Sequence, residues 1–551
     1  MSKQSQQPNR GFDGAENLGT LTFVAANQNR AVDDLQVKYA AAARVWAVRL
    51  GVVTILALGG CDGLASSPRR RALNAADQAR VETACQGCHV LPAADILPRA
   101  RWRELIPTMT SMPIENGIRP PTVSEMRLAI AHYDGLAPES LAPIEPAKSD
   151  ASRIHFEIEG FTPPGLEKER IPAVGGVRFV DVDDSGRLSL IAAEMRTGSV
   201  LRLDAGAEGR ARRFVPIVQG LAYPVRTTVV STAQRGAPEL LVAEIGAMNP
   251  SNETRGSVSL LSADADGKYT TKQLVGELGR ACDVCIADLD NDADLDLIVS
   301  AFGWRGPGAL QLYFNGGGSL AAATFEVVTL DERDGFLESH VTDLDGDGRL
   351  DILALVSQHY EELLLFRCEG ERKFAPHVIH RAEHPAWGFS GFEPHDFDGD
   401  GDLDVLISNG DTLDDNQLKP YHGVSWLENR GNMQFEPRTI TPLYGCEDAT
   451  AADLDLDGDL DVVAVSFLPQ LPPATWIERG IDSIVWVEKL PDGAWRTHSL
   501  EKHHAYHPAV TVGDYNADGH PDIAAANYIW IGADGVPFVR ADYLTLMTAA
   551  W

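Results

Sequence analysis

The nonapeptide Asp-Leu-Asp-Gly-Asp-Gly-Arg-Leu-Asp, residues 343–351, decides the fold because related copies recur along the chain. Four close copies begin at residues 288, 396, 453 and 514, a weaker one begins at 181, and a copy without aspartate, STAQRGAPE, begins at 231. Successive copies start 50 to 61 residues apart. Short apolar stretches precede and follow them, which predicts two strands joined by a polar loop. Seven such units predict a repeat architecture.

Further β-rich segments, such as 424–427 and 484–487, bring each unit to roughly four strands, the content of one β-propeller blade. Only 29 residues follow Asp522, so the last unit lacks a strand. We expect residues 153–159 to supply it, because a strand from the start of the domain closes the ring and protects both sheet edges. A propeller without this closure is the alternative. Residues 153–551 are thus expected to form an all-β, seven-bladed propeller.

The acidic loops carry oxygen-bearing side chains at positions 1, 3, 5 and 9, and most have glycine at position 6, where the chain turns sharply. Hard oxygen ligands at this spacing suit Ca²⁺. The candidate calcium ligands are Asp288, Asp290, Asp292, Asp296, Asp343, Asp345, Asp347, Asp351, Asp396, Asp398, Asp400, Asp404, Asp453, Asp455, Asp457, Asp461, Asp514, Asn516, Asp518 and Asp522. The weaker copy offers Asp181, Asp183, Ser185 and Ser189 and should bind poorly, and Arg235 at position 5 argues against metal in the copy at 231.

This pattern resembles the FG-GAP or VCBS repeat family, whose propellers carry such loops in the hairpin after the innermost strand. The resemblance covers about residues 153–551 and implies a structural role for about five Ca²⁺ ions. Four carboxylates in one loop repel each other without a cation, so we expect metal binding to be coupled to folding. Extracellular modules bind Ca²⁺ at about 0.1–1 mM, which favours a location outside the cytosol.

Residues 85–89 read Cys-Gln-Gly-Cys-His, the C-x-x-C-H pattern of covalent haem attachment. Cys85 and Cys88 would be bonded to the porphyrin, and His89 would bind its iron. A zinc knuckle would need a second pair of ligands, and this domain offers only His132. The motif therefore predicts haem c.

A sixth iron ligand is expected downstream of the motif. Met109, in a loop shaped by Pro107, is the first candidate, Met112 is its rival, and His132 is the third. Thioether ligation raises the haem potential. A capping box at 122–125 predicts the start of a final helix. Residues 62–136 resemble a compact class I cytochrome c, which implies a small all-α domain.

Residues 1–60 are interpreted as a leader. An apolar run at 50–58, too short to span a bilayer, follows two arginines and ends in Leu-Gly-Gly-Cys. These are signal-peptide features, and the ending resembles a bacterial lipobox, which implies a lipid on Cys61. The long stretch before the run is explained by a start codon further downstream, and a short buried helix is the alternative. Residues 137–152, rich in Pro, Ala and Ser, are interpreted as a linker.

The net charge of −32 excludes nucleic acid and anionic membrane surfaces as partners, because these polyanions need clustered Lys and Arg. We expect an exported, periplasmic or cell-surface bacterial lipoprotein that contacts the membrane only through its lipid. Haem c would exchange electrons with a redox partner protein, and the propeller would be a docking scaffold. In one alternative the propeller is a sugar oxidoreductase or lyase that passes electrons to the cytochrome, and in another it is an adhesion or carbohydrate-binding module.

One face of the propeller channel is expected to be polar and acidic. It would carry Asp283, Glu338, His340, His359, Glu393, Asp411, Asp448 and His507, and an insertion at 409–429 adds Asp414, Asp415, Lys419, Tyr421 and His422. Carboxylates beside histidine are suited to acid–base work, but polar propeller rims are also often merely solvated. Cys282 and Cys285 would lie in an inner strand, where side chains three apart point to opposite faces, so packing is favoured over a local disulfide. The pairing of Cys368 and Cys446 stays open.

Overall fold

The computed structural model describes residues 73–86, 91–109, 119, 121–144 and 154–550, except 169, 183–185, 205–211, 232–237, 265, 359, 371, 414, 533–536 and 538. The expected leader with Cys61 therefore lies outside the described residues, as do Cys88, His89 and Met112. Within the described residues, no helix combines the length and the apolar character needed to cross a membrane.

The first described part of the chain is helical and builds a core of its own. Its elements are α2 (Ala75–Cys85), the 3-10 turn η1 (Ala94–Ile96), α3 (Arg99–Met109) and α4 (Val123–Leu136). Asn74 caps α2 by accepting a hydrogen bond from the backbone N–H of Asp77. The predicted capping box of Thr122 and Glu125 is confirmed at the start of α4. Propensity and capping therefore define where these helices begin.

Two aromatic side chains hold the helices together. Trp102 of α3 and Tyr133 of α4 are each 2% exposed, and their rings stack 3.8 Å apart. Their polar atoms donate hydrogen bonds to backbone carbonyls of the segment before α3, Trp102 to Ala94 at 3.0 Å and Tyr133 to Pro92 at 3.0 Å. Both rings are thus buried without an unsatisfied polar atom.

The first residues of the expected linker belong to this helical part. Ala137 is 1% exposed, and its carbonyl accepts a hydrogen bond from Nη2 of Arg99 at 2.7 Å. The carbonyl of Pro138 accepts the backbone N–H of Arg99 at 2.8 Å. Because the first N–H groups of a helix have no partner within it, the carbonyl of Pro138 satisfies the first N–H of α3.

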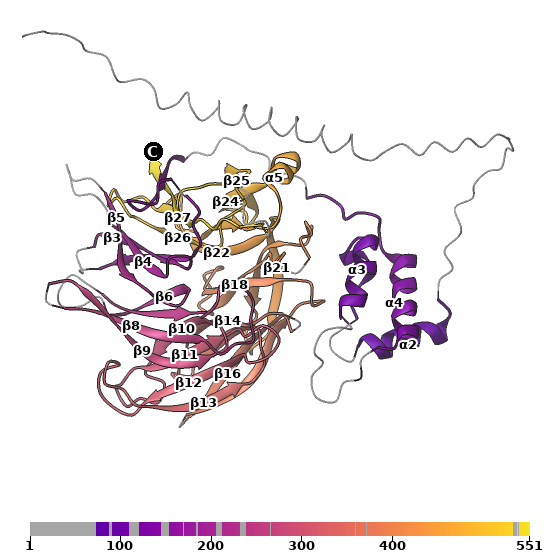
Figure 1. Ribbon diagram of the computed structural model, residues 1–551, viewed down its shortest axis with the longest axis horizontal. Helices are drawn as coiled ribbons and strands as arrows, with labels where there is room; N and C mark the ends of the chain where they lie inside the picture. The colour runs from indigo at the N-terminus through magenta and orange to yellow at the C-terminus, as the bar shows by residue number, and fades with distance from the viewer. Residues whose placement is uncertain are drawn as a thin grey trace, which may run out of the picture. The chain divides into compact units, whose positions relative to one another are not determined.

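Residues 154–550 form seven four-stranded antiparallel sheets, the blades of a propeller (Figure 1). Blades 1 to 3 consist of β2 (Val174–Asp181), β3 (Leu188–Glu194), β4 (Ser199–Asp204) and β5 (Arg213–Gln219); β6 (Pro224–Ser231), β7 (Glu239–Glu244), β8 (Gly256–Ala263) and β9 (Tyr269–Leu278); and β10 (Ala281–Ala287), β11 (Asp296–Ala301), β12 (Ala309–Asn315) and β13 (Phe325–Asp331). The remaining strands follow the same order.

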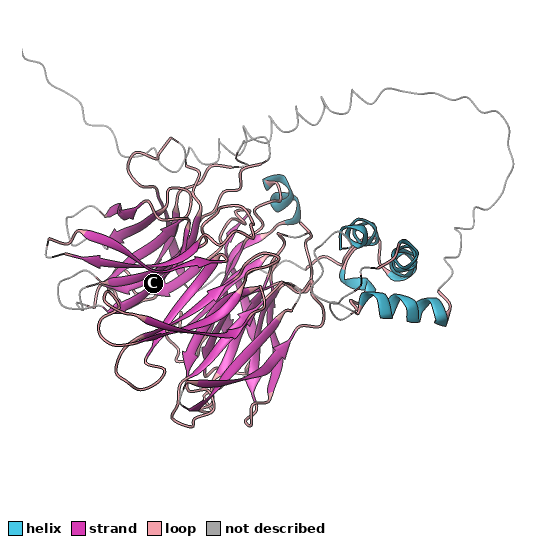
Figure 2. Ribbon diagram, turned by 60° about the horizontal axis from the view of Figure 1, so that its bottom comes forward, coloured by secondary structure: helices cyan, strands magenta, loops and turns pink. Residues whose placement is uncertain are grey.

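Blades 4 to 6 consist of β14 (Phe336–Thr342), β15 (Asp351–Val356), β16 (Glu362–Gly370) and β17 (Lys373–Arg381); β18 (Phe389–His395), β19 (Asp404–Asn409), β20 (Gly423–Asn429) and β21 (Phe435–Pro442); and β22 (Cys446–Ala452), β23 (Asp461–Ser466), β24 (Asp482–Lys489) and β25 (Trp495–Lys502). Blade 7 consists of β26 (Val510–Gly513), β27 (Asp522–Ala526), β28 (Leu544–Ala550) and β1 (His155–Phe161). A short helix, α5 (Pro473–Arg479), stands between β23 and β24. The strands thus belong to the propeller, and the other helices precede it in the chain (Figure 2).

The predicted closure of the ring is confirmed. Strand β1 pairs antiparallel with β28, from His155 opposite Ala550 to Phe161 opposite Leu544. Innermost strands contact their neighbours around the ring, and β26 of blade 7 contacts β2 of blade 1. The alternative of an unclosed terminal blade is therefore wrong.

Burial explains why the second strand of each blade is the most apolar. All six residues of β15, Asp-Ile-Leu-Ala-Leu-Val, are buried, whereas the outermost strand β13 is largely exposed or half-buried. A strand covered by sheets on both faces has no solvated side, so it reads as a continuous apolar run. The aspartate that opens β15 is the exception, and it belongs to the acidic loop.

Candidate functional site

Each acidic loop joins the innermost strand of a blade to its second strand and folds around its first aspartate. In blade 4 the carboxylate of Asp343 accepts backbone N–H groups from Asp347 at 3.0 Å and Gly348 at 2.9 Å. The first aspartate accepts two such bonds in the other four loops as well. Gly348, at position 6, has φ +86°, a conformation that glycine adopts without steric cost.

The aspartate at position 9 ties the loop to the third strand. Asp351 is 1% exposed, and its two oxygens accept the backbone N–H groups of Leu344 at 3.3 Å and of Cys368, on β16, at 2.7 Å. Asp296, Asp404, Asp461 and Asp522 are held in the same way. Burial raises the pKa of Asp296 and Asp404 to about 6 and that of Asp461 to about 7.

Four of the five loops bring three carboxylates together. One oxygen from each lies within 4.8 Å of the others in the groups Asp288, Asp290, Asp296; Asp343, Asp345, Asp347; Asp396, Asp398, Asp404; and Asp453, Asp455, Asp457. The buried Oδ1 atoms of Asp290 and Asp455 have no hydrogen-bond partner among the described residues. Buried polar atoms are nearly always satisfied, and converging carboxylates are what Ca²⁺ binds. These donor sets therefore fit a calcium ion.

The other loops fit a cation less well. In blade 7 the amide of Asn516 donates to Asp518 at 2.9 Å, and no group of three converging acids is found among the described residues of that loop. In blade 1 the hydroxyl of Ser189 donates to Asp204 at 3.0 Å, while Asp183 and Ser185 lie outside the described residues. Arg235 in blade 2 also lies outside them.

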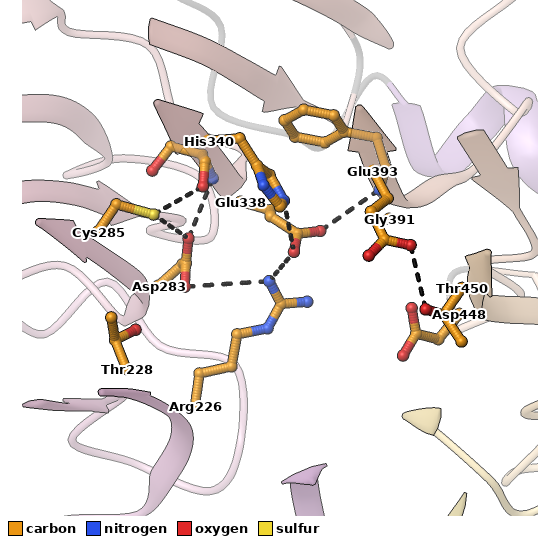
Figure 3. Close-up of polar contacts among 12 residues, drawn as sticks. Arg226, Thr228, Asp283, Cys285, Glu338, His340, Gly391, Glu393, Asp448 and Thr450 are labelled. Atoms are coloured by element: carbon orange, nitrogen blue, oxygen red, sulfur yellow. Dashed lines mark hydrogen bonds and ion pairs between the residues drawn. The ribbon is translucent and has the colours of Figure 1, made fainter. Parts of the chain in front are cut away.

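A second acidic group lines the channel between the innermost strands. Six of these strands shift register once near their start, and the bulge brings one residue of each strand to an equivalent position. These residues are Gly176, Arg226, Asp283, Glu338, Gly391 and Asp448. The residues two positions later in blades 2 to 6 are Thr228, Cys285, His340, Glu393 and Thr450, and Figure 3 shows the residues of blades 2 to 6 at both positions around one space.

Arg226 is the cation of this channel site. Its Nη1 lies 2.5 Å from Oε1 of Glu338 and 4.0 Å from Oδ1 of Asp283. Burial opposes the charged form of Arg226, but the carboxylates of Glu338, Asp283 and Asp448 raise its pKa above the ordinary value. Burial likewise opposes ionisation of Glu338, yet Arg226 and His340 lower its pKa to about 2. The pair is therefore charged at neutral pH.

The opposite side of the channel site holds carboxyl groups without an arginine. Glu393 accepts hydrogen bonds from the Thr450 hydroxyl and the Ala451 N–H, both at 3.1 Å, and lies 3.1 Å from Nε2 of His395. Burial raises the pKa of Asp448 to about 7, and the negative charge of Glu338 is the next largest cause of this rise. A carboxyl group that titrates near neutral pH beside an ionised one is able to exchange a proton there.

The structure assembles five of the eight residues expected on this face: Asp283, Glu338, His340, Glu393 and Asp448. His359 lies outside the described residues. His507 is 0% exposed and is bonded instead to Glu501, at 2.8 Å, and to the carbonyl of Ala526, at 3.1 Å. The backbone carbonyl of Asp411 accepts a hydrogen bond from the ammonium group of Lys419. Arg226 was missed because no sequence motif surrounds it, and only its register position reveals it.

The insertion at 409–429 is packed into the fold. Lys419 and Asp415 form an ion pair at 3.0 Å with side chains 3% and 6% exposed. Tyr421 stacks on Trp387 at 5.4 Å, and burial lowers the pKa of His422 well below its ordinary value. Asp415, Lys419 and His422 are buried, and Tyr421 is half-buried. A functional role of this insertion stays a prediction. Asp414 lies outside the described residues.

The haem motif begins at the last residue of α2. Cys85 packs against the apolar core of the helical part, which includes Val81, Trp102 and Tyr133. Cys88 and His89 lie outside the described residues, as does the side chain of Met109. Met109 ends α3, so the expectation that it stands in a loop is wrong. Pro107 lacks the N–H that would bond to the carbonyl of Arg103, and α3 ends two residues after it.

The four described cysteines of the propeller form no disulfide. Cys282 and Cys285 are not bridged, and the Cys285 thiol donates to the carbonyl of Ser339 at 2.8 Å. Cys368 and Cys446 are buried. Packing thus accounts for all four propeller cysteines.

Comparison with known proteins supports the assignment of the repeats. A family model described as FG-GAP-like repeat matches residues 343–407 and 396–464. Each match runs from the acidic loop of one blade into the second strand of the next, and the two matches start 53 residues apart, which is the spacing of these loops in the sequence. No curated protein matches the chain. The chain therefore carries FG-GAP-like repeats within a seven-bladed β-propeller.

Proposed function

We propose that this chain is an exported electron-transfer protein in which a haem c in the helical part carries electrons and a calcium-stabilised propeller serves as a docking scaffold. The observation that carries the proposal is Cys85, which ends α2 in a Cys-Gln-Gly-Cys-His sequence and packs against an apolar core. A porphyrin needs such an apolar surface beside its thioether bonds. Lipid attachment at Cys61 would hold the protein at the cell surface or in the periplasm.

The residues divide the work of holding the haem. Cys85 and Cys88 would form the thioether bonds, and His89 and Met109, with Met112 as its rival, would bind the iron. Bound haem c supplies one-electron redox chemistry. The helical core around Trp102 and Tyr133 would exclude water from one side of the group and keep α2 in place.

An absorption spectrum tests this proposal directly. The full chain, matured in a host that attaches haem c, should show haem bands that survive acid–acetone extraction. The variants Cys85→Ala and Cys88→Ala should lose covalent haem, whereas Cys282→Ala, a propeller thiol, should keep it. A colourless, iron-free protein with intact Cys85 and Cys88 would remove the redox role.

For the propeller, the converging carboxylates support calcium binding. Calcium titration of the metal-free chain should show several bound ions and a rise in melting temperature, with affinities of about 0.1–1 mM for extracellular modules. Magnesium should substitute poorly, because it demands a smaller octahedral site. Equal melting temperatures in Ca²⁺ and in EGTA would remove the structural role of the loops.

The channel site favours a second candidate, an enzyme that uses the channel carboxyl groups to move protons while its substrate loses two electrons, one at a time, through the haem to the redox partner protein. Asp448, with a pKa near 7, lies across from ionised Glu338 in a space where Gly391 contributes no side chain. If sugars or other carbohydrates are substrates, one of them should reduce the haem bands, and Asp448→Asn should abolish that reduction while leaving the haem in place. If no compound of a sugar library reduces the haem or is consumed, the scaffold role stands alone.

A further inference from the structure

The carboxylates at position 3 of the acidic loops differ in their partners. In blade 3, Asp290 is paired with Arg372, and in blade 4, Asp345 is paired with Arg367. In blades 5 and 6, no ion pair reaches Asp398 or Asp455 among the described residues. Blades 3, 5 and 6 have loops of equal formal charge, with five aspartates each. The difference between them therefore comes from outside the loop.

Arg372 reaches the blade 3 loop from the neighbouring blade. It stands in the turn between β16 and β17 of blade 4 with φ +63°. Its Nε and Nη2 lie 2.6 and 2.5 Å from Oδ2 of Asp290, and its Nη1 lies 2.9 Å from Glu326 on β13. The guanidinium also lies over the ring of Phe314 on β12, 4.5 Å from its centroid. Three residues of blade 3 thus hold one side chain of blade 4.

This contact gives a partner to only one of the two carboxylate oxygens of Asp290. Oδ2 of Asp290 is bound to the guanidinium, whereas Oδ1 is buried without a partner among the described residues, and the Asp290 side chain is 9% exposed. A guanidinium is always protonated and holds a carboxylate in fixed geometry. It neutralises part of the loop charge even where no metal is bound, and it repels a divalent cation that approaches the same oxygens.

We propose that Arg372 is a built-in cation of the blade 3 loop, so that this loop keeps its shape without Ca²⁺ and binds the ion more weakly than the equally acidic loops of blades 5 and 6. The inference rests on the proposed calcium binding of the propeller. In blade 6 the nearest described cation, Lys489, approaches only Asp459 at position 7, at 4.0 Å, and leaves Asp455 at position 3 without a counter-charge. The calcium dependence of the propeller is therefore concentrated in blades 5 and 6.

Calcium binding and stability of the full chain, with and without Arg372→Gln, test the inference. Isothermal titration with Ca²⁺ should show that one site of the variant binds the ion roughly tenfold more tightly. A unit charge a few ångströms from a divalent ion near a protein surface changes its affinity by about this factor. The variant should also melt at a lower temperature than the wild type in EGTA, and this deficit should shrink in saturating Ca²⁺. Arg438→Gln is the matched control, because Arg438 pairs with Glu428 and Glu436 and with no loop aspartate.

A second variant separates charge from shape. Arg372→Lys keeps the charge but loses the planar fork, and it should retain most of the wild-type stability in EGTA. Loss of folding by Arg372→Gln in both EGTA and Ca²⁺, with Arg372→Lys equally affected, would assign the residue to packing and overturn the proposal. Unchanged affinities in Arg372→Gln would also overturn it while leaving calcium binding intact. A wild-type chain that binds no Ca²⁺ would instead overturn the calcium role of all the loops.

Discussion

The propeller contains two groups of carboxylates that balance their charge in different ways. In the loops of blades 5 and 6, the first aspartate, such as Asp396, accepts hydrogen bonds from backbone N–H groups of its own loop, and no ion pair reaches the aspartate at position 3 among the described residues. In the channel, Glu338 is bonded to Arg226, which comes from another blade. The first arrangement suits a metal cation that binds reversibly, and the second contains the permanent charge of an arginine side chain. Acidic residues of one type therefore serve an exchangeable site and a fixed one.

Removal of the permanent cation should have the largest effect. Arg226→Gln leaves Glu338 and Asp283 in the channel without their counter-charge, and we expect a loss of about 2–3 kcal/mol in the free energy of unfolding. This is less than for a fully enclosed pair, because 31% of the Arg226 side chain is exposed. Urea denaturation at pH 7 measures it. Arg255→Gln, an exposed arginine that pairs with Glu253 at the surface, should change stability by less than about 0.5 kcal/mol.

The pH dependence of this loss identifies its cause. The pKa of Glu338 is about 2 in the folded protein, below its ordinary value of 4.5, so pairing with Arg226 stabilises the fold above pH 4.5. The stabilisation disappears as the pH falls toward 2, because Glu338 becomes protonated. The deficit of Arg226→Gln should therefore shrink in acid. An equal deficit at pH 3 and pH 7 would point to lost packing rather than lost charge.

Asp448 should respond in the opposite direction. Its pKa of about 7 in the folded protein lies above the ordinary value of 3.8, so the wild type loses stability as the pH rises through this interval. Asp448→Asn removes that loss and should be more stable than the wild type at pH 8 by about 1–2 kcal/mol, with little difference at pH 4. Denaturation at both pH values measures it. Asp448 accepts hydrogen bonds from the backbone N–H groups of Ala449 and Val510. A variant that is less stable than the wild type at pH 8 would mean that these hydrogen bonds to the carboxylate outweigh the cost of its charge.

The exchangeable site is tested within a single loop of blade 5. Asp398 belongs to the converging group, whereas Asp402, at position 7, does not. Asp398→Ala and Asp402→Ala remove the same charge, but only the first removes a candidate ligand. We expect Asp398→Ala to weaken one calcium site by roughly tenfold or more and Asp402→Ala to weaken it far less. Equal weakening would show that net charge, rather than ligand geometry, determines the affinity.

Local sequence was sufficient for the parts of the molecule that are local. The acidic loops, the strands that flank them and their period follow from contiguous residues, and the closing strand near His155 follows from counting strands. The capping box at Thr122 is a four-residue pattern and formed as predicted. Each of these predictions needed only neighbours in the chain.

The rest depended on contacts between distant residues. Arg226 meets Glu338 only because bulges in both strands align them, and bulges leave no mark in the sequence. The structural role of Asp351 comes from the N–H of Cys368, on another strand. The insertion around Lys419 is polar in sequence but buried, because its charges pair internally. Arg372 acts on the loop of another blade, so nothing near Asp290 predicts it.

The smallest effect concerns position 6, where the loops differ in backbone strain. Ala293 in blade 3 has φ +72°, and glycine holds the same place in blades 4 to 7 with φ between +86° and +98°. Ala293→Gly should stabilise the chain by about 1 kcal/mol, because a left-handed residue with a Cβ costs about 1–2 kcal/mol. Gly458→Ala in blade 6 is the reverse change, and a Cβ there meets no atom within 4 Å, so only the dihedral angle would destabilise it. Melting temperatures in EGTA should move in opposite directions for the two variants, and a shift in the same direction would mean that chain flexibility, rather than strain, controls these turns.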